Sequence, residues 1–206
     1  MSRSIAIAAT MAALAVPSLA LAATMKGTDA ADTLAGTASA DTIFGKGGDD
    51  TITGLAGDDR LRGDRGDDTV DGGEGDDGVS GRQDADELTG AAGDDRLHGG
   101  RGDDSLDGGD GDDRLRGGSG DDEIEGGAGE DRIRADKGED TVDAGADDDH
   151  VNSRDRFADE VDCGGGEDSV TADSKDTLTN CEDTSVRKAP KGKERERPAK
   201  AKGPKA

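Results

Sequence analysis

Single apolar residues recur at every ninth position along most of this chain. When the sequence is cut into rows of nine from Gly27, residues 27–152 form 14 rows without a gap, and position eight of each row is Leu, Ile or Val. Residues 23–206 hold 21 Leu, Ile, Val or Phe, and 17 of them occupy position eight once three looser rows after residue 152 are counted. The looser rows require a one-residue insertion at Ser153 and a later one-residue deletion. A fixed period of nine indicates a structural repeat.

Polar residues keep the same register. Position six is Asp in all 14 rows, and position one is Gly in all rows except those that begin at Ala135 and Ala144. Glycine and aspartate favour turns. In the three residues after each Asp, the apolar residue of position eight lies between the residues of positions seven and nine. Each row therefore predicts a turn followed by a three-residue strand whose middle side chain points inward.

Composition by itself suggests disorder. The 206 residues carry a net charge of −24, with 35 Gly, two Phe and no Trp or Tyr. Few apolar residues and a high net charge are typical of unfolded chains, and they exclude a thick core or an aromatic-lined pocket. A disordered chain has no reason to place its apolar residues at one position in nine. The register therefore favours a fold that something other than a thick core stabilises.

The two ends differ from the repeats. Residues 1–22 combine Arg3, an apolar run and the small-x-small sequence Ala20-Leu21-Ala22, which predicts a secretory signal peptide cleaved before Ala23. An uncleaved membrane anchor is the alternative. Residues 187–206 hold nine Lys or Arg, two Glu and three of the four prolines, which predicts a disordered basic tail of net charge +7. Residues 23–186 between them carry a net charge of −32.

Rows such as GGRGDDSLD (99–107) and GGDGDDRLR (108–116) resemble the nonapeptide G-G-x-G-x-D-x-U-x of the RTX, or hemolysin-type, calcium-binding repeats. The resemblance implies an all-β fold, a right-handed parallel β-roll in which two rows form one 18-residue coil. Residues 23–152 would then form about seven regular coils, and residues 153–186 an irregular extension of degenerate rows. Calcium ions would lie between equivalent turns of successive coils, so six gaps on each edge give a ceiling of about 12 ions.

The resemblance also implies the ligands of these ions. Calcium prefers carboxylate and carbonyl oxygens. The implied side-chain ligands are Asp50, Asp59, Asp68, Asp77, Asp95, Asp104, Asp113, Asp122, Asp131 and Asp140, and the implied turn-backbone ligands are Gly72, Gly99, Gly108, Gly117 and Gly126. Rows 27–44 depart from the glycine pattern and are expected to form a cap. Asp84 and Asp147 replace glycine at position four, which weakens the case for sites in rows 81–89 and 144–152.

Cys163 and Cys181 are 18 residues apart, which is one coil of the implied roll. Equivalent residues of successive coils lie about 4.8 Å apart, which is within the Cα range of a disulfide. An exported chain favours oxidation, so we expect a disulfide that clamps the C-terminal end of the roll. A pair of metal thiolates is the alternative.

Charged residues at outward positions seven and nine separate by row. Odd and even rows are expected to form opposite sheets. Odd rows carry six acidic residues and no basic residue, whereas even rows carry Arg60, Arg62, Arg96, Arg114, Arg116, Arg132 and Arg134 and no acidic residue. One hypothesis is a basic plate that engages an anionic surface or the acidic face of another copy. The other is that each Arg reaches back to neutralise carboxylates in the turns.

These observations predict a secreted bacterial protein that binds calcium and folds when it meets extracellular calcium. The alternative is a structural or adhesive cell-surface protein that calcium stabilises and that contacts anionic polymers through its Arg face or basic tail. The sequence has no HExxH, GxSxG, P-loop or zinc-ligand spacing, so we do not expect an enzyme. Neither a specific nucleic-acid partner nor a transmembrane segment in the cleaved chain is expected.

Overall fold

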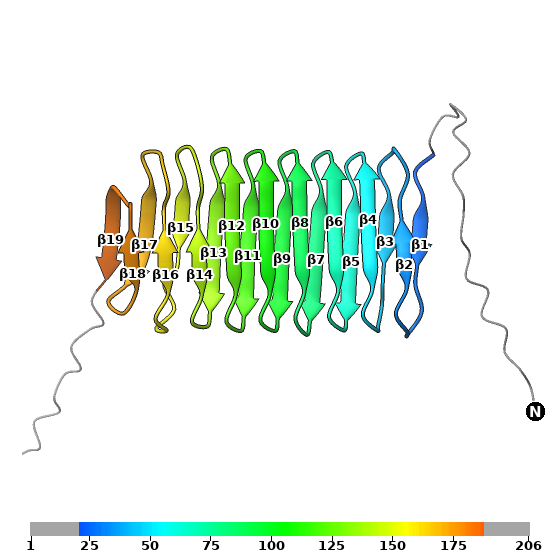
Figure 1. Ribbon diagram of the computed structural model, residues 1–206, viewed down its shortest axis with the longest axis horizontal. Helices are drawn as coiled ribbons and strands as arrows, with labels where there is room; N and C mark the ends of the chain where they lie inside the picture. The colour runs from blue at the N-terminus through cyan, green and yellow to red at the C-terminus, as the bar shows by residue number, and fades with distance from the viewer. Residues whose placement is uncertain (1–20, 188–206) are drawn as a thin grey trace, which may run out of the picture.

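The structure, a computed structural model, describes residues 21–187, and these residues form 19 β-strands and no α-helix. The strands stack into one elongated roll, with β1 (Thr24–Lys26) and β19 (Asp183–Arg187) at opposite ends of the stack (Figure 1). Most of the predicted signal peptide (residues 1–20) and nearly all of the predicted basic tail (residues 188–206) lie outside the described residues. Within residues 21–187, no helix is long and apolar enough to cross a membrane.

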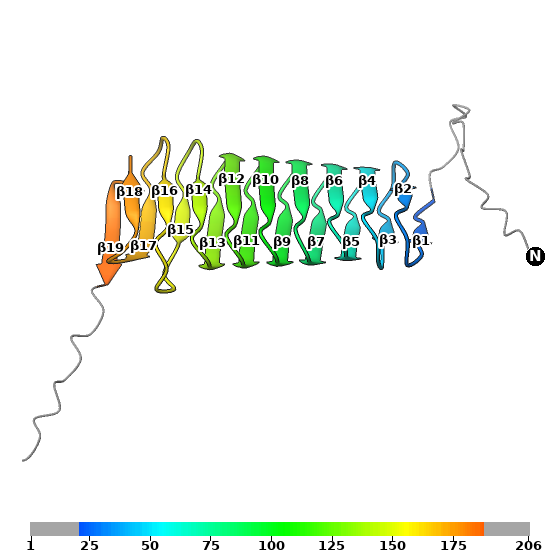
Figure 2. The same ribbon diagram turned by 60° about the horizontal axis from the view of Figure 1, so that its bottom comes forward.

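The strands form two parallel sheets that face each other (Figure 2). One sheet contains β1 (Thr24–Lys26), β3 (Thr42–Phe44), β5 (Arg60–Arg65), β7 (Gly78–Gln83), β9 (Arg96–Arg101), β11 (Arg114–Ser119), β13 (Arg132–Lys137), β15 (His150–Asn152), β17 (Ser169–Asp173) and β19 (Asp183–Arg187). The other contains β2 (Thr33–Ala35), β4 (Thr51–Ala56), β6 (Thr69–Glu74), β8 (Glu87–Ala92), β10 (Ser105–Asp110), β12 (Glu123–Ala128), β14 (Thr141–Asp143), β16 (Glu160–Asp162) and β18 (Thr177–Thr179). The predicted all-β parallel roll is confirmed, and odd and even rows form opposite sheets.

Each strand pairs with the equivalent strand of the next coil. Leu106 lies opposite both Leu88 and Ile124, so the repeat distance is 18 residues. The distance becomes 19 where Val142 pairs with Val161, and 17 where Val161 pairs with Leu178. These shifts follow from the insertion at Ser153 and the later deletion, and the roll continues through the degenerate rows to β19.

The strands in the centre of the roll are longer than the three residues predicted. Strands β4 to β13 each contain six residues, which occupy positions seven to nine of one row and one to three of the next. Position two has a positive φ, for example 106° at Gly73 and 79° at Ala91. This left-handed residue bends the chain while positions nine, two and three stay paired with the adjacent coil, so only positions four to six form the turn.

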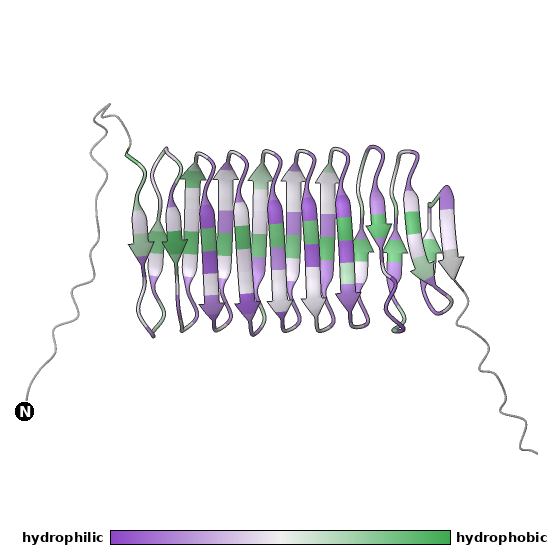
Figure 3. Ribbon diagram, turned by 180° about the vertical axis from the view of Figure 1, so that it is seen from behind, coloured by the Kyte–Doolittle hydropathy of each residue, from purple (hydrophilic) through white to green (hydrophobic). Residues whose placement is uncertain are grey.

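The hydrophobic core is two columns of single side chains. The position-eight residues from Ile43 to Val170 are at most 2 % exposed, and they form a green band across the middle of the strands in Figure 3. Burial of each such side chain contributes roughly 1.5–3 kcal/mol. The core is therefore continuous but thin, as the composition required.

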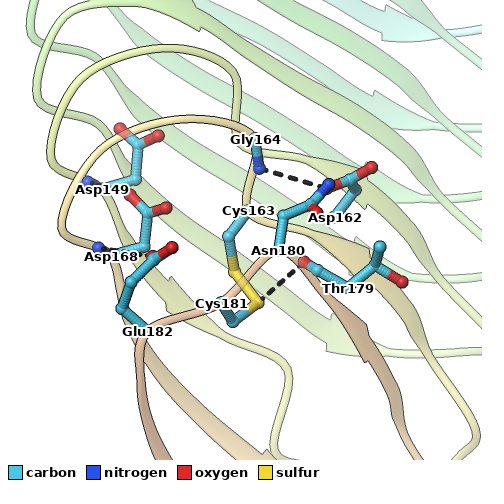
Figure 4. The surroundings of a disulfide bond; sticks show 9 residues. All are labelled: Asp149, Asp162, Cys163, Gly164, Asp168, Thr179, Asn180, Cys181 and Glu182. Carbon is cyan, nitrogen blue, oxygen red and sulfur yellow. Dashed lines mark hydrogen bonds between the residues drawn. A yellow bond between two sulfur atoms is a disulfide. The ribbon is translucent and has the colours of Figure 1, made fainter.

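A disulfide ties the last coils together. Cys163 and Cys181 are bonded, and their Cα atoms lie 5.2 Å apart (Figure 4). The predicted pairing is confirmed, and the 18-residue separation places the two cysteines on successive coils.

Candidate metal centres along the two edges

A row of buried aspartates runs along each edge of the roll, where the chain passes from one sheet to the other. The position-six side chains from Asp41 to Asp168 are at most 3 % exposed. An ionised carboxylate removed from water is costly unless hydrogen bonds or an opposite charge compensate it. The hydrogen bonds of the two carboxylate oxygens therefore decide whether these aspartates need a cation.

One oxygen of each carboxylate links successive coils. Asp104 Oδ1 accepts a hydrogen bond from Asp86 N at 3.0 Å, and Asp122 Oδ1 accepts one from Asp104 N at 2.9 Å. The same bond repeats on the other edge, where Asp113 Oδ1 accepts from Asp95 N at 2.7 Å. Backbone N–H groups therefore stabilise the ionised form of one oxygen per residue.

The other oxygen has no partner. In 14 consecutive position-six residues Oδ2 is buried and accepts no hydrogen bond: Asp50, Asp59, Asp68, Asp77, Asp86, Asp95, Asp104, Asp113, Asp122, Asp131, Asp140, Asp149, Asp159 and Asp168. Buried polar atoms are normally paired, so an unpaired carboxylate oxygen repeated this often indicates that these atoms bind a ligand. A hard cation would complete these oxygens.

The first two rows differ. Asp32 Oδ2 accepts hydrogen bonds from Thr28 N at 2.5 Å and Thr28 Oγ1 at 2.9 Å. Asp41 Oδ2 accepts one from Thr37 N at 2.6 Å. Both carboxylates are satisfied within the chain, and neither belongs to the predicted ligand set.

The position-one glycines keep an oxygen-lined space open. A Cβ on Gly90 would lie closer than 3.0 Å to both Asp95 Oδ2 and the carbonyl oxygen of Gly108 in the next coil. The structure corrects the expectation that this position belongs to the turn. Because position two takes the bend, the glycines assigned to the turn backbone lie inside strands β6 and β9 to β12: Gly72, Gly99, Gly108, Gly117 and Gly126.

The turns themselves present a second row of oxygens. Position four has a positive φ, such as 130° at Gly93 and 138° at Gly111. The carbonyl oxygen of Gly93 points at Gly111 in the next coil, so closely that a Cβ there would overlap it. Stacked turn carbonyls thus run along each edge, two residues before the buried aspartates. Turn carbonyls were expected as ligands, but the glycines named for that role were those of position one, not position four.

Four further aspartates share the geometry of the predicted ligands. Asp86, Asp149, Asp159 and Asp168 have the same buried, unpaired Oδ2. Asp84 and Asp147, which replace glycine at position four, adopt φ values of 73° and 76° and so preserve the turn. Aspartate tolerates the left-handed conformation better than most residues. The only sequence signal that these four share with the predicted ligands is their place at position six of a row.

Burial shifts the acid–base equilibrium of the rows. Burial raises the pKa of Asp86 to about 8, with a further contribution from the charges of Asp104 and Asp68, although a backbone hydrogen bond opposes the shift. The same causes raise the pKa of Asp95 and Asp122 to about 7. Without a cation these side chains would hold protons near neutral pH.

The donor set favours calcium over zinc. Within residues 21–187, no three His, Cys, Asp or Glu side chains are grouped so as to hold a metal ion. A cation here would combine carboxylates with backbone carbonyls, and an oxygen-only set suits calcium.

Comparison with known proteins agrees with this chemistry. A family model for the RTX calcium-binding nonapeptide repeat matches residues 26–61, 44–79, 53–88, 80–115, 89–124 and 116–151. No curated protein matches the chain. The matches together span residues 26–151, which is more than half of the sequence, and this chain therefore belongs to the family of RTX calcium-binding nonapeptide repeat proteins.

Proposed function

We propose that this protein binds calcium ions along both edges of the roll, without catalysis, and that calcium binding drives its folding outside the cell. The observation that carries the proposal is the series of 14 buried aspartates whose Oδ2 atoms have no partner. Without cations, the repulsion between these carboxylates opposes a core of two thin columns. Calcium would supply the opposing charge, so binding and folding are coupled.

The arrangement of the unpaired oxygens supports the proposed number of ions. The 14 aspartates divide equally between the two edges, which leaves six intervals on each edge and a ceiling of about 12 ions. The proposed side-chain ligands include Asp86, Asp149, Asp159 and Asp168 in addition to those expected from the sequence. Backbone carbonyls of positions one and four would complete the coordination.

A calcium titration followed by far-UV circular dichroism tests the proposal. At pH 8 we expect a coil spectrum in EDTA, a β spectrum in millimolar calcium, and reversal when EDTA is added again. Equilibrium dialysis should count more than one ion per chain. A spectrum that stays coil in about 10 mM calcium, tenfold above the weak end of extracellular sites, would overturn the proposal.

The surroundings of Ala23 support cleavage of the predicted signal peptide before this residue. The backbone nitrogen of Ala23 donates a hydrogen bond of 2.5 Å to Asp41 Oδ1, in the place that an Asp N–H takes in every later coil. Cleavage before Ala23 would leave an α-ammonium group at this atom, beside a buried carboxylate. We therefore expect Edman degradation of the secreted protein to begin at Ala23. A chain that begins elsewhere would contradict this step.

A structural or adhesive role at the cell surface is the second candidate. The exposed Arg60, Arg96, Arg114 and Arg132 form no ion pair with any residue of the described part of the chain, which leaves them available to an anionic partner. Pull-down with the producing cells tests this candidate. We expect calcium-dependent retention of the protein on the cells, and equal recovery with and without calcium would contradict it.

A further inference from the structure

The two sheets present outward faces of opposite charge. Strands β5, β7, β9, β11 and β13, the basic face, contain 11 Arg or Lys and two Asp. Strands β4, β6, β8, β10, β12 and β14, the acidic face, contain eight Asp or Glu and no Arg or Lys. Because the central strands are six residues long, position three extends the separation seen at positions seven and nine, whereas both Asp residues of the basic face occupy position two.

Two aspartates neutralise only part of the basic face. Asp64 pairs with Arg62 at 2.8 Å and with Arg82 at 3.5 Å. Asp136 pairs with Arg116 and Arg134 in the same way. The position-nine arginines therefore bind carboxylates of their own sheet, rather than those of the turns.

The position-seven arginines form an unpaired ladder. Arg96, Arg114 and Arg132 lie opposite one another on adjacent strands, and all three are exposed. Like charges in directly opposed positions destabilise a sheet. Nothing within residues 21–187 compensates these three with an ion pair, so a partner outside the chain would relieve the repulsion.

The acidic face contains a matching ladder. Asp107, Glu125 and Asp143 lie opposite one another on the adjacent strands β10, β12 and β14, and they too are exposed. Strand spacing sets both ladders, at about 4.8 Å per step. Acidic and basic ladders of one molecule therefore have the same period, and they stay in register over three strands.

We propose that the basic face of one copy of this protein binds the acidic face of a second copy. A polyanion would use the basic face alone. The confinement of acidic side chains to the opposite sheet would then have no role. A second copy uses both faces, and its charges repeat at the spacing of the arginine ladder. The proposal rests on the proposed function, because only the calcium-bound roll would present these faces.

The geometry makes this contact open-ended and weak. The two faces lie on opposite sides of the roll, so the contact is heterologous and each added copy exposes a new free face. Five strands of six residues cover about 500 Å² per partner, so the total buried area is near the lower limit for specific complexes. Mostly ionic contacts at a solvated surface are also screened at high salt.

Sedimentation velocity of the mature, full-length protein in 5 mM calcium tests the proposal. We expect the sedimentation coefficient to rise with protein concentration in 20 mM NaCl, and to return to the monomer value in 300 mM NaCl. Two neutralised variants identify the faces: Arg96→Gln/Arg114→Gln/Arg132→Gln for the basic face, and Asp107→Asn/Glu125→Gln/Asp143→Asn for the acidic face. Circular dichroism in calcium confirms that each variant forms the roll.

The mixture of the two variants gives the sharpest result. Each variant alone should remain a monomer, because one of its faces no longer binds. Mixed in equal amounts they should form a 1:1 heterodimer and nothing larger, since only one pair of intact faces remains. This stoichiometry does not arise from nonspecific ionic aggregation.

Several results would overturn the proposal. Wild-type protein that forms the roll but stays monomeric in 20 mM NaCl would remove self-association and leave calcium binding intact. If that monomer instead bound polyphosphate through the arginine ladder, the partner would be a polyanion. Association that survives both face variants, but is lost when the Lys and Arg residues of 188–206 are changed to Gln, would assign the contact to that segment. A chain that remains coil in calcium would overturn both proposals.

Discussion

The first two rows of the roll and the rows that follow use the same aspartate in different ways. In the first two rows the N–H of position two donates to the carboxylate, as Thr28 and Thr37 do to Asp32 and Asp41. In the third row the N–H of Lys46 instead donates to the carbonyl oxygen of Gly63 in the next coil, at 2.8 Å. The carboxylate of Asp50 then has an oxygen without a partner.

This difference connects the direction of one backbone N–H to the need for a ligand. Strands β1 and β2, which precede the cap turns, and β3, which precedes the row of Asp50, all stop after three residues, so strand length alone does not separate the two kinds of row. A row that gives its position-two N–H to the sheet gains backbone pairing with the next coil but leaves one carboxylate oxygen without a partner. The cap is satisfied by its own chain, whereas under the proposed function the centre of the roll depends on calcium.

A change of pH without calcium should produce the largest effect, because it acts on the whole centre of the roll. Burial raises the pKa of Asp68, Asp77 and Asp104 to about 6, that of Asp95 to about 7 and that of Asp86 to about 8. An unfolded Asp titrates near 3.9. The folded state thus binds more protons, so the stability from protonation is complete below about pH 4 and is lost as the pH rises through 6 to 8.

Circular dichroism in EDTA between pH 8 and pH 5 measures this effect. We expect β structure to appear as the pH falls, since protons replace calcium on the central carboxylates. Equilibrium dialysis provides the matched test. At a calcium concentration that keeps the roll folded at both pH 8 and pH 6, the protein should hold fewer ions at pH 6, because protons compete for the same oxygens. A number of bound ions that does not depend on pH would contradict the assignment of the buried aspartates as ligands.

The disulfide extends the comparison to the other end of the roll. There a covalent bond, rather than hydrogen bonds from threonine, secures the last coils, and Asp168 still has an unpaired oxygen. Removing an 18-residue cross-link should lower the free energy of unfolding by roughly 3 kcal/mol on the chain-entropy model. The double variant Cys163→Ala/Cys181→Ala, unfolded by urea in calcium, measures the loss.

Hydrogen exchange shows where the loss occurs. Amide protection should fall in β16 to β19 and remain in β6 to β12, because only the last coils are clamped. Dithiothreitol-treated wild type is the matched control, and it should behave like the double variant. Uniform loss of protection along the roll would show that the disulfide supports the whole stack rather than its end.

Much of this architecture was predictable because position within the repeat determines the environment. Position eight predicted the core, the alternation of rows predicted the two sheets, and the 18-residue spacing predicted the Cys163–Cys181 bond. The length of the strands was not predictable, because residues with ordinary side chains, such as Leu55 and Arg82, hold the left-handed position two. A glycine requirement is visible in a sequence, whereas a left-handed Leu or Arg is not.

The same limit applies to the candidate sites. The departures at Asp84 and Asp147 suggested weak sites, yet both residues adopt the conformation of the glycine they replace. The bonding of Asp32 and Asp41 was equally hidden, because it depends on where one backbone N–H points. Side-chain identity predicted which carboxylates are buried, and only backbone geometry separates those that are satisfied from those that are not.

Substitution of one aspartate from each region tests the comparison directly. Asp104→Asn removes a central carboxylate, and it should weaken calcium binding by at least about tenfold, the lower end of the loss seen when even the outer partners of metal ligands are removed. Asp32→Asn is the matched control in the cap and should leave the calcium midpoint unchanged. Calcium titration by circular dichroism and ion counting by equilibrium dialysis measure both variants. Equal losses in the two variants would remove the distinction between cap and centre.

The smallest expected effect concerns the hydrogen bonds that make the cap independent of calcium. Thr28 Oγ1 donates to Asp32 Oδ2 at 2.9 Å and accepts from Ala30 N at 3.2 Å, so Thr28→Val removes both bonds while the Thr28 N–H still reaches the carboxylate. A net loss of about 1 kcal/mol is expected, because water replaces part of what the exposed hydroxyl provided. Thr33→Val is the control, since Thr33 is an exposed residue of the same row in β2.

Hydrogen exchange of residues 23–44 in saturating calcium should therefore accelerate in Thr28→Val and not in Thr33→Val, while both variants bind as many ions as the wild type. A loss of bound calcium in Thr28→Val would mean that Asp32 is itself a ligand. The cap would then obey the same rule as the centre, and position two would not decide how a row satisfies its aspartate.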